Sequence, residues 1–121
     1  MGDIGGNTNA IVQMCNIYRD DLGSQHRKWA DVAKLNGFLD LASAGTNHGS
    51  LMKRVEESDY IYICDFFEPK SEDGQKLTTE NSRILIDGEI YEVKLYDDPM
   101  NLHHHMEIYL KYLGGQSEHT V

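Results

Sequence analysis

The alternation of apolar and polar residues is clearest in the stretch RILIDGEIYEVKLY, residues 83–96. An Asp-Gly pair between two alternating runs is typical of a two-residue β-hairpin loop, because a type I′ turn needs two residues that tolerate positive φ. With Asp87 and Gly88 as the loop, Ile84 lies opposite Tyr91. Since side chains alternate along a strand, one face of this hairpin is apolar and is predicted to face a core. That face consists of Ile84, Ile86, Tyr91, Val93 and Leu95.

The opposite face of the hairpin is polar. Arg83 lies opposite Glu92 as a cross-strand pair of unlike charge, with Lys94 beside it. This pattern predicts a sheet with one face on a core and the other partly in water. A lone hairpin is marginal in water, so the rest of the chain is expected to supply partner strands.

Three further stretches have the composition of strands. Residues 10–18 (AIVQMCNIY) alternate, residues 59–67 (DYIYICDFF) are aromatic and β-branched, and residues 106–113 (MEIYLKYL) also alternate. A helix is the alternative for the last stretch. The first and second stretches each contain one cysteine, Cys15 and Cys64, and we expect both to be buried free thiols.

Residues 26–42 fit two structures. Trp29, Val32 and Ala33 have helical spacing, but the same residues fit a long strand that is broken at Gly37. We favour the strand. Turn signals at residues 19–24, 69–76 and 97–99 separate the predicted strands. Short strands with such turns between them predict a mainly β fold, as a small barrel or sandwich.

Length and charge limit the possible functions. The chain has 121 residues, enough for one domain, which we place at residues 10–115 between a flexible leader (1–9) and a flexible tail (116–121). It carries 20 acidic and 11 basic residues, a net charge of −9 with neutral histidines. This balance argues against a tight electrostatic grip on nucleic acid or on an anionic membrane. We see neither a membrane span nor a secretory signal, so we expect a cytoplasmic location.

No group of residues predicts catalysis, a cofactor or a metal centre. His103 and His105 would point the same way on a strand, but zinc needs further ligands, and no Cys or His pair at metal spacing accompanies them. A solvated loop or a subunit contact is the favoured interpretation of the run that also includes His104. Asp20-Asp21 and Asp97-Asp98 sit at turns, where Asp bonds locally to the backbone. We therefore expect a protein that is not an enzyme.

Residues 11–115 as a whole resemble the head completion proteins of long-tailed bacteriophages, which form the stopper ring of the head-to-tail connector. The resemblance lies in the first strand and turn leading to Lys28-Trp29-Ala30-Asp31 and in Tyr60-Ile61-Tyr62 after a polar insertion. It continues in the hairpin block from Arg83-Ile84 through Gly88-Glu89-Ile90-Tyr91 to Asp98-Pro99 and Leu110-Lys111.

The resemblance implies a small β barrel with a long loop, residues 43–58, inserted between its second and third strands. It implies a virion protein, assembled in the host cytoplasm, that forms a twelve-fold homo-oligomeric ring. The portal and an adaptor ring would lie above this ring, and a tail terminator or tail tube below it. The ring would close the DNA channel after packaging, dock the tail, and let DNA pass without sequence-specific binding. The acidic balance agrees with such sliding.

The inserted loop is the expected contact between subunits. A polar stretch followed by an apolar and charged arm buries too little surface to order itself in a monomer. In a ring, its apolar side chains could pack on a neighbouring copy while its basic ones meet acidic groups. The expected interface and channel residues are Leu51, Met52, Lys53, Arg54, Val55 and Glu56.

Two other classes remain open. A small oligonucleotide-binding barrel would need a basic face with exposed aromatic residues; tyrosines are present, but the net charge has the wrong sign. A neighbouring part of the phage neck, an adaptor or a tail terminator, is the other alternative. Adaptors of this kind tend to be helical, so a mainly helical protein would favour that class.

Overall fold

The computed structural model of this protein describes residues 6–41 and 58–116. This part of the chain is mainly β, as predicted, and its one helical element is a single 3-10 turn. The elements are β1 (Thr8–Arg19), β2 (Gln25–Leu41), β3 (Tyr60–Asp65), β4 (Ser82–Ile86), β5 (Glu89–Asp97), the 3-10 helix η1 (Pro99–Asn101) and β6 (His105–Gln116).

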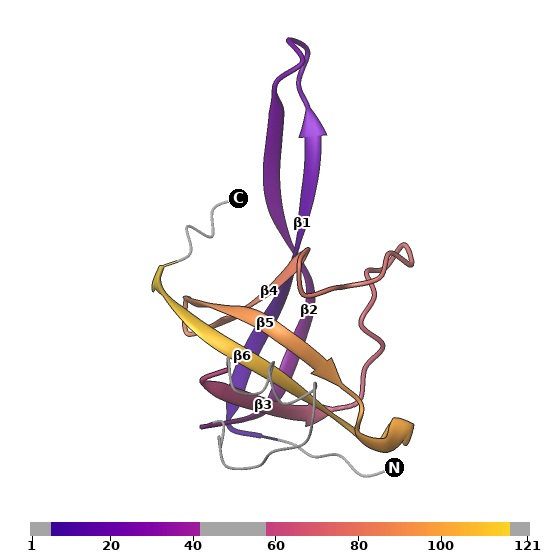
Figure 1. Cartoon of the computed structure of the whole chain (residues 1–121), viewed down its shortest axis with the longest axis vertical. Coiled ribbons are helices and arrows are strands. Elements are labelled where there is room, and N and C mark those ends of the chain that lie inside the picture. Colours follow the sequence, from indigo (N-terminus) through magenta and orange to yellow (C-terminus); the bar gives the residue numbers. More distant parts are fainter. Residues whose placement is uncertain (1–5, 42–57, 117–121) are drawn as a thin grey trace.

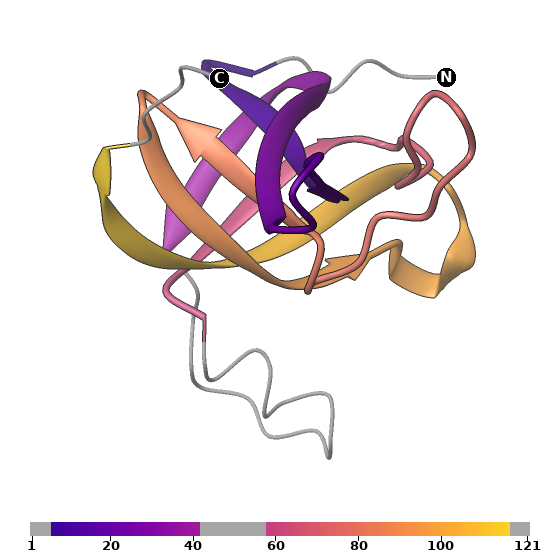
Figure 2. The same ribbon diagram turned by 90° about the horizontal axis from the view of Figure 1, so that it is seen from above.

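The six strands form one antiparallel sheet that closes on itself. Their order is β1-β2-β3-β6-β5-β4, and β4 pairs back onto β1. Figure 2 shows the strands surrounding a common interior, and Figure 1 shows β1 and β2 continuing beyond it. Closure leaves few exposed strand edges around the interior. The inserted loop predicted at residues 43–58 lies outside the described residues, apart from Ser58.

The hairpin of β4 and β5 has the predicted register. Ile84 pairs with Tyr91, and Ile86 with Glu89. Asp87 and Gly88 both have positive φ, 54° and 79°, as a type I′ turn requires. The local Asp-Gly signal therefore determines this part of the fold.

Side chains from all the strands fill the interior. The largest fully buried residues include Tyr62, Met14, Ile84, Met106, Ile108 and Leu110. The buried cluster also contains Ile86, Tyr91 and Val93, which were expected there.

Leu95 was expected in the same core but lies outside it and is only partly buried. A bulge between Val93 and Leu95 shifts the register of β5 against β6. An extra residue reverses the side to which the following side chains point. Tyr96 therefore packs against the core where the uninterrupted alternation had placed Leu95.

The strand predicted from residue 26 onward is β2, which ends at Leu41, but its irregularity is not at Gly37. Val12 pairs with Ala33 and Gln13 with Asp31, so Val32 is the bulged residue of β2. Gly37 continues the ladder and is needed for another reason. A Cβ at Gly37 would come within 2.1 Å of the backbone oxygen of Ile63 on β3.

Candidate functional site

The candidate functional site is residues 16–28, the part of β1 and β2 that projects from the closed sheet. We call it the arm. On one side, β4 pairs with β1 only from Ile11 to Met14, and on the other, β3 pairs with β2 only from Gly37 to Leu41. Within the described residues, the two strands of the arm therefore form a ladder with each other alone, as Figure 1 shows.

A polar network holds the base of the arm, next to the bulge. The side chain of Gln13 is 3% exposed, and its Nε2 donates to Asp31 Oδ1 at 2.8 Å. Its Oε1 accepts a hydrogen bond of 2.8 Å from Arg83 Nε. The guanidinium of Arg83 lies over the ring of Trp29, 4.1 Å from the centroid. A buried amide needs hydrogen-bond partners, so this network fixes the base of the arm to Arg83 of β4.

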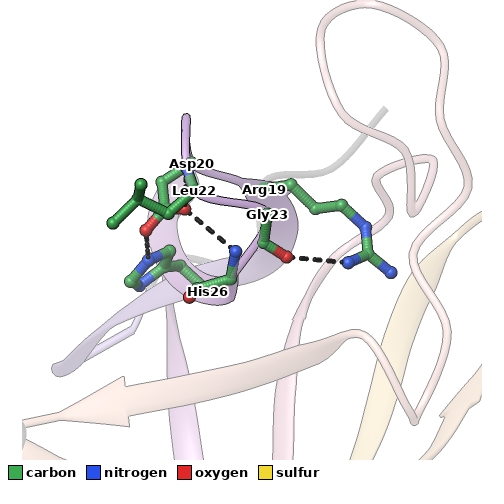
Figure 3. Close-up of polar contacts among 6 residues, drawn as sticks. Arg19, Asp20, Leu22, Gly23 and His26 are labelled. Atoms are coloured by element: carbon green, nitrogen blue, oxygen red, sulfur yellow. Dashed lines mark hydrogen bonds and ion pairs between the residues drawn. The ribbon is translucent and has the colours of Figure 1, made fainter.

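The tip of the arm is organised by Asp20 (Figure 3). Its Oδ1 accepts the backbone N–H groups of Leu22 and Ser24, both at 2.9 Å, and its Oδ2 lies 2.7 Å from His26 Nε2. The hydrogen bond from His26, followed by that from Ser24, lowers the pKa of Asp20. Arg19 Nη1 donates to the carbonyl of Gly23 at 2.9 Å. The carboxylate of Asp20 thus has the structural turn role predicted for it.

The two faces of the arm differ in chemistry. Ile17 pairs with Arg27 and Tyr18 with His26, and paired residues point to the same side. Tyr18 and His26 stack on one face, with ring centroids 5.3 Å apart. The other face, which we call the arginine face, consists of Ile17, Arg19 and Arg27; Trp29, just below the arm, points to the same side. With Arg83 over Trp29, this side carries three of the four arginines in the chain.

The arm exposes three large hydrophobic side chains to solvent. Ile17 is 56% exposed, Tyr18 50% and Leu22 90%. A two-stranded ribbon is marginal in water, and its unpaired edges are sites where other chains can add. The arm thus combines exposed hydrophobic side chains with unpaired strand edges, two features that favour contact with another chain.

A cleft of about 800 Å³ opens at the base of the arm. Its lining includes Trp29 with the overlying Arg83, and the apolar residues Ile90 and Leu113. The cleft also contains the acidic residues Glu80 and Glu92. Leu113 is 57% exposed. Lys94 also lines the cleft, 3.5 Å from Glu92, so Glu80 is the exposed carboxylate of this surface. A concave surface with exposed apolar groups and such a carboxylate can receive an apolar segment that carries a basic side chain.

His103 and His104 are exposed and lie outside any strand, as the interpretation of a solvated loop predicted. His103 has a φ of 58°, so it lies in a turn, and β6 begins only at His105. The Nδ1 of His103 is 2.5 Å from Asp98 Oδ2, and its ring stacks on Phe66 at 4.4 Å. His105 Nε2 lies 3.0 Å from Glu107 Oε2. Each ring thus has its own carboxylate partner, and the described residues hold no group of three ligands suited to a metal ion.

The two cysteines have different environments. Both are free thiols. Cys64 is 1% exposed, and burial raises the pKa of its thiol to about 12. Cys15, at the base of the arm, is only partly buried, so the expected burial holds fully for Cys64 alone.

The sequence predicted an interface at residues 51–56 and a turn at residues 19–24. The residues expected at the interface, 51–56, lie outside the described part of the chain. Residues 19–24 were predicted as a turn, but the projection of their flanking strands was missed. A signal was present, because residues 16–28 (NIYRDDLGSQHRK) hold six charged or histidine side chains and lack a continuous apolar face.

Comparison with models of known protein families gives no match, and comparison with curated proteins gives no significant match. Within residues 6–41 and 58–116, no helix has the length and apolar character needed to cross a membrane. Function is therefore inferred from the residues of this chain, the geometry of the arm and cleft, and the resemblance described above.

Proposed function

We propose that this chain is a structural virion protein that forms a ring in the phage head-to-tail connector. In this role the ring lies below the portal and adaptor, closes the DNA channel after packaging, and gives the tail its docking surface. The observation that carries the proposal is a closed β sheet from which an arm projects with 56% of Ile17 and 90% of Leu22 exposed. Exposed apolar surface of this kind marks an interaction site, and a ring subunit needs an element that reaches a neighbour.

The chain order supports this proposal. Residues 42–59 lie between β2 and β3 in the sequence, which is the position at which the family resemblance implies a long inserted loop. The hairpin and the turn at Asp98 and Pro99 follow in the order that the resemblance requires. The mainly β fold also disfavours the helical adaptor that was one alternative.

The charge of the protein supports the same role. With a net charge of −9, the chain as a whole repels DNA phosphates, so it suits a channel through which DNA slides. The same charge disfavours an oligonucleotide-binding barrel. The carboxylates that sequence analysis singled out, such as Asp20 and Asp98, bond to nearby backbone and histidine groups. They are engaged in local structure, which agrees with a structural rather than catalytic protein.

The experiment is electron microscopy of DNA-filled heads that carry the portal and adaptor, mixed with the full-length chain. We expect added density of twelve-fold symmetry on the axis below the portal, and heads that retain their DNA longer than untreated heads. Heads that lack the portal are the matched control and should gain no density. If portal-bearing heads gain neither density nor DNA retention at saturating protein, the proposed function is wrong.

A further inference from the structure

We infer that the arm of one copy docks in the cleft of a neighbouring copy of this chain, through the arginine face. This inference deepens the proposed function, because it assigns the contact that would join adjacent subunits of the ring. The cleft at the base of the arm has an apolar part, which includes Ile90 and Leu113, and four charged lining residues, Glu80, Arg83, Glu92 and Lys94.

Charge selects a second copy as the partner. The arm carries three basic side chains (Arg19, Arg27 and Lys28) and two acidic ones, so it is net positive by one. The total charge is −9, which leaves a net charge of −10 on the rest of the chain. The arm is thus a basic projection on an acidic body. Opposite charges steer association and suppress wrong contacts.

The charges of the two surfaces also allow a local ion pair. Arg19 and Arg27 lie on the arginine face, and Asp20 on the same arm is already engaged by His26 and the turn backbone. The lining of the cleft holds two acidic and two basic side chains, and the basic Lys94 lies 3.5 Å from Glu92. Glu80 is exposed, so its carboxylate is the one that an arginine of the arm can meet.

The apolar groups supply the remaining contact. Ile17 lies between the arginines on the arm and is more than half exposed. The cleft presents Ile90 and Leu113, of which Leu113 is also more than half exposed. Docking removes these side chains from water together, and burial of apolar area is the main source of affinity in such contacts.

The position of the cleft makes the contact a head-to-tail one. Trp29 belongs to the cleft and also marks the base of the arm, and the arm extends away from that base as a paired ladder (Figure 1). A copy therefore cannot place its own arm in its own cleft without breaking the ladder. A contact between two different patches repeats from copy to copy and closes into a ring when the rotation permits.

The test uses charge reversal in the full-length chain. The arm variant is Arg19→Glu with Arg27→Glu, and the cleft variant is Glu80→Lys with Glu92→Lys. Glu80→Lys alone is the second cleft variant, because Glu80 is exposed and its replacement leaves the pairing of β4 with β5 intact. Lys28→Glu is the matched control, since Lys28 lies on the opposite face of the same arm. Thermal unfolding first establishes that each variant is folded.

Sedimentation velocity at low salt then measures self-association. We expect the wild-type chain to self-associate, and the arm and cleft variants each to associate at least about tenfold more weakly, as loss of interface charge pairs does. An equimolar mixture of arm and cleft variants should recover the wild-type behaviour, because every contact in it joins unlike charges again. Lys28→Glu should associate like the wild type.

In sedimentation, three results would overturn the inference. The wild-type chain could stay monomeric up to about 1 mM, where even weak contacts populate; the arm and cleft variants could associate like the wild type; or the mixture could recover nothing. Loss of binding to a DNA duplex in the arm variant, with unchanged self-association, would identify the arm as a nucleic-acid contact instead.

Portal-bearing heads separate the docking inference from the proposed function. If the arm variant still forms the ring density, the docking inference fails and the proposed function stands. If the wild type associates through the arm but does not bind heads, the proposed function fails and the docking inference stands.

Discussion

The two halves of β1 and β2 are built from the same antiparallel ladder but have opposite relations to water. In the closed sheet, Val12 is completely buried and Met14 is 2% exposed; in the arm, three residues further along β1, Ile17 is 56% exposed. The difference is the third strand. From Ile11 to Met14, β1 also pairs with β4, whereas beyond Cys15 the described part of the chain supplies no further strand to cover it. Strand formation and burial are therefore separate properties in this protein.

This comparison assigns different tasks to the two halves. The sheet half contributes to the stability of the domain, since its side chains belong to the buried cluster. The arm half adds little buried area within one copy, so its apolar and basic side chains contribute mainly when a partner is present. Substitutions should accordingly affect folding in one half and assembly in the other.

The largest expected effect is on a core residue of the sheet. Tyr91 is 7% exposed and contacts the ring of Tyr60 edge-on at 5.7 Å. Tyr91→Ala should lower the free energy of unfolding by roughly 3–5 kcal/mol, measured by denaturant titration, as large-to-small core changes do. The control Ile17→Ala on the arm should change it by no more than about 0.5 kcal/mol. Equal effects of the two substitutions would erase the distinction between the halves.

Thiol reactivity compares the same two environments without changing the fold. Cys64 is buried, and its raised thiol pKa of about 12 leaves very little thiolate at neutral pH. Cys15, at the base of the arm, is partly exposed. With a colorimetric thiol reagent and no denaturant, Cys15 should react at least about a hundredfold faster than Cys64, whose labelling requires local opening. Single Cys→Ser variants assign the two rates, and rapid labelling of Cys64 in the native protein would contradict its burial.

The junction between the halves should be sensitive to loss of its buried amide. Gln13→Leu removes the hydrogen bonds to Asp31 and to Arg83 while keeping a side chain of similar size. The substitution should cost about 1–3 kcal/mol of unfolding free energy, because polar partners of a buried group lose their hydrogen bonds. Asn16→Ala, on the exposed side of the junction, is the control and should be close to neutral. A neutral Gln13→Leu would show that the network does not hold the arm in place.

The smallest expected effect is a pH dependence confined to the tip of the arm. The pKa of Asp20 is lowered by His26 and by backbone N–H groups, so the charged carboxylate stabilises the turn. This stabilisation is complete above the ordinary carboxyl pKa of 3.8 and is lost as the pH falls through the lowered value. In NMR spectra, the amide signals of Leu22 and Ser24 should shift in that acidic range, and Asp20→Asn should abolish the shift. If these amide signals do not shift as the pH falls below the ordinary carboxyl pKa, the Asp20 carboxylate does not stabilise the turn.

Local signals in the sequence predicted the sheet better than the arm. The Asp-Gly pair specifies its own hairpin, because the conformation of the turn depends on Asp87 and Gly88 alone. The position of Leu95 could not be predicted, since the bulge before it forms against β6, which is distant in the sequence. His103 was expected in a solvated loop and is exposed there. The conformation of that loop could not be predicted, because its backbone has positive φ at His103 and is held by the side chain of Asp98.

The arm was missed because projection depends on where other strands end. Nothing in residues 16–28 indicates that β4 starts pairing at Met14 or that β3 pairs only from Gly37 onward. The charged composition of this stretch fits both a solvated turn and an exposed ribbon. The expectation that chain contacts lie in residues 51–56 stays a prediction, alongside the contact now inferred for the arm.

The most direct test replaces the arm and compares folding with assembly. Cys15 and Trp29 are paired, so Asn-Gly in place of residues 16–28 closes a two-residue hairpin between them. The shortened chain should keep its unfolding free energy within about 1 kcal/mol, because the buried cluster is unchanged. Mixed with portal-bearing heads, it should fail to form the ring density that the full chain gives in electron micrographs. A shortened chain that is folded and still fills the ring at wild-type occupancy would contradict the assignment of assembly to the arm.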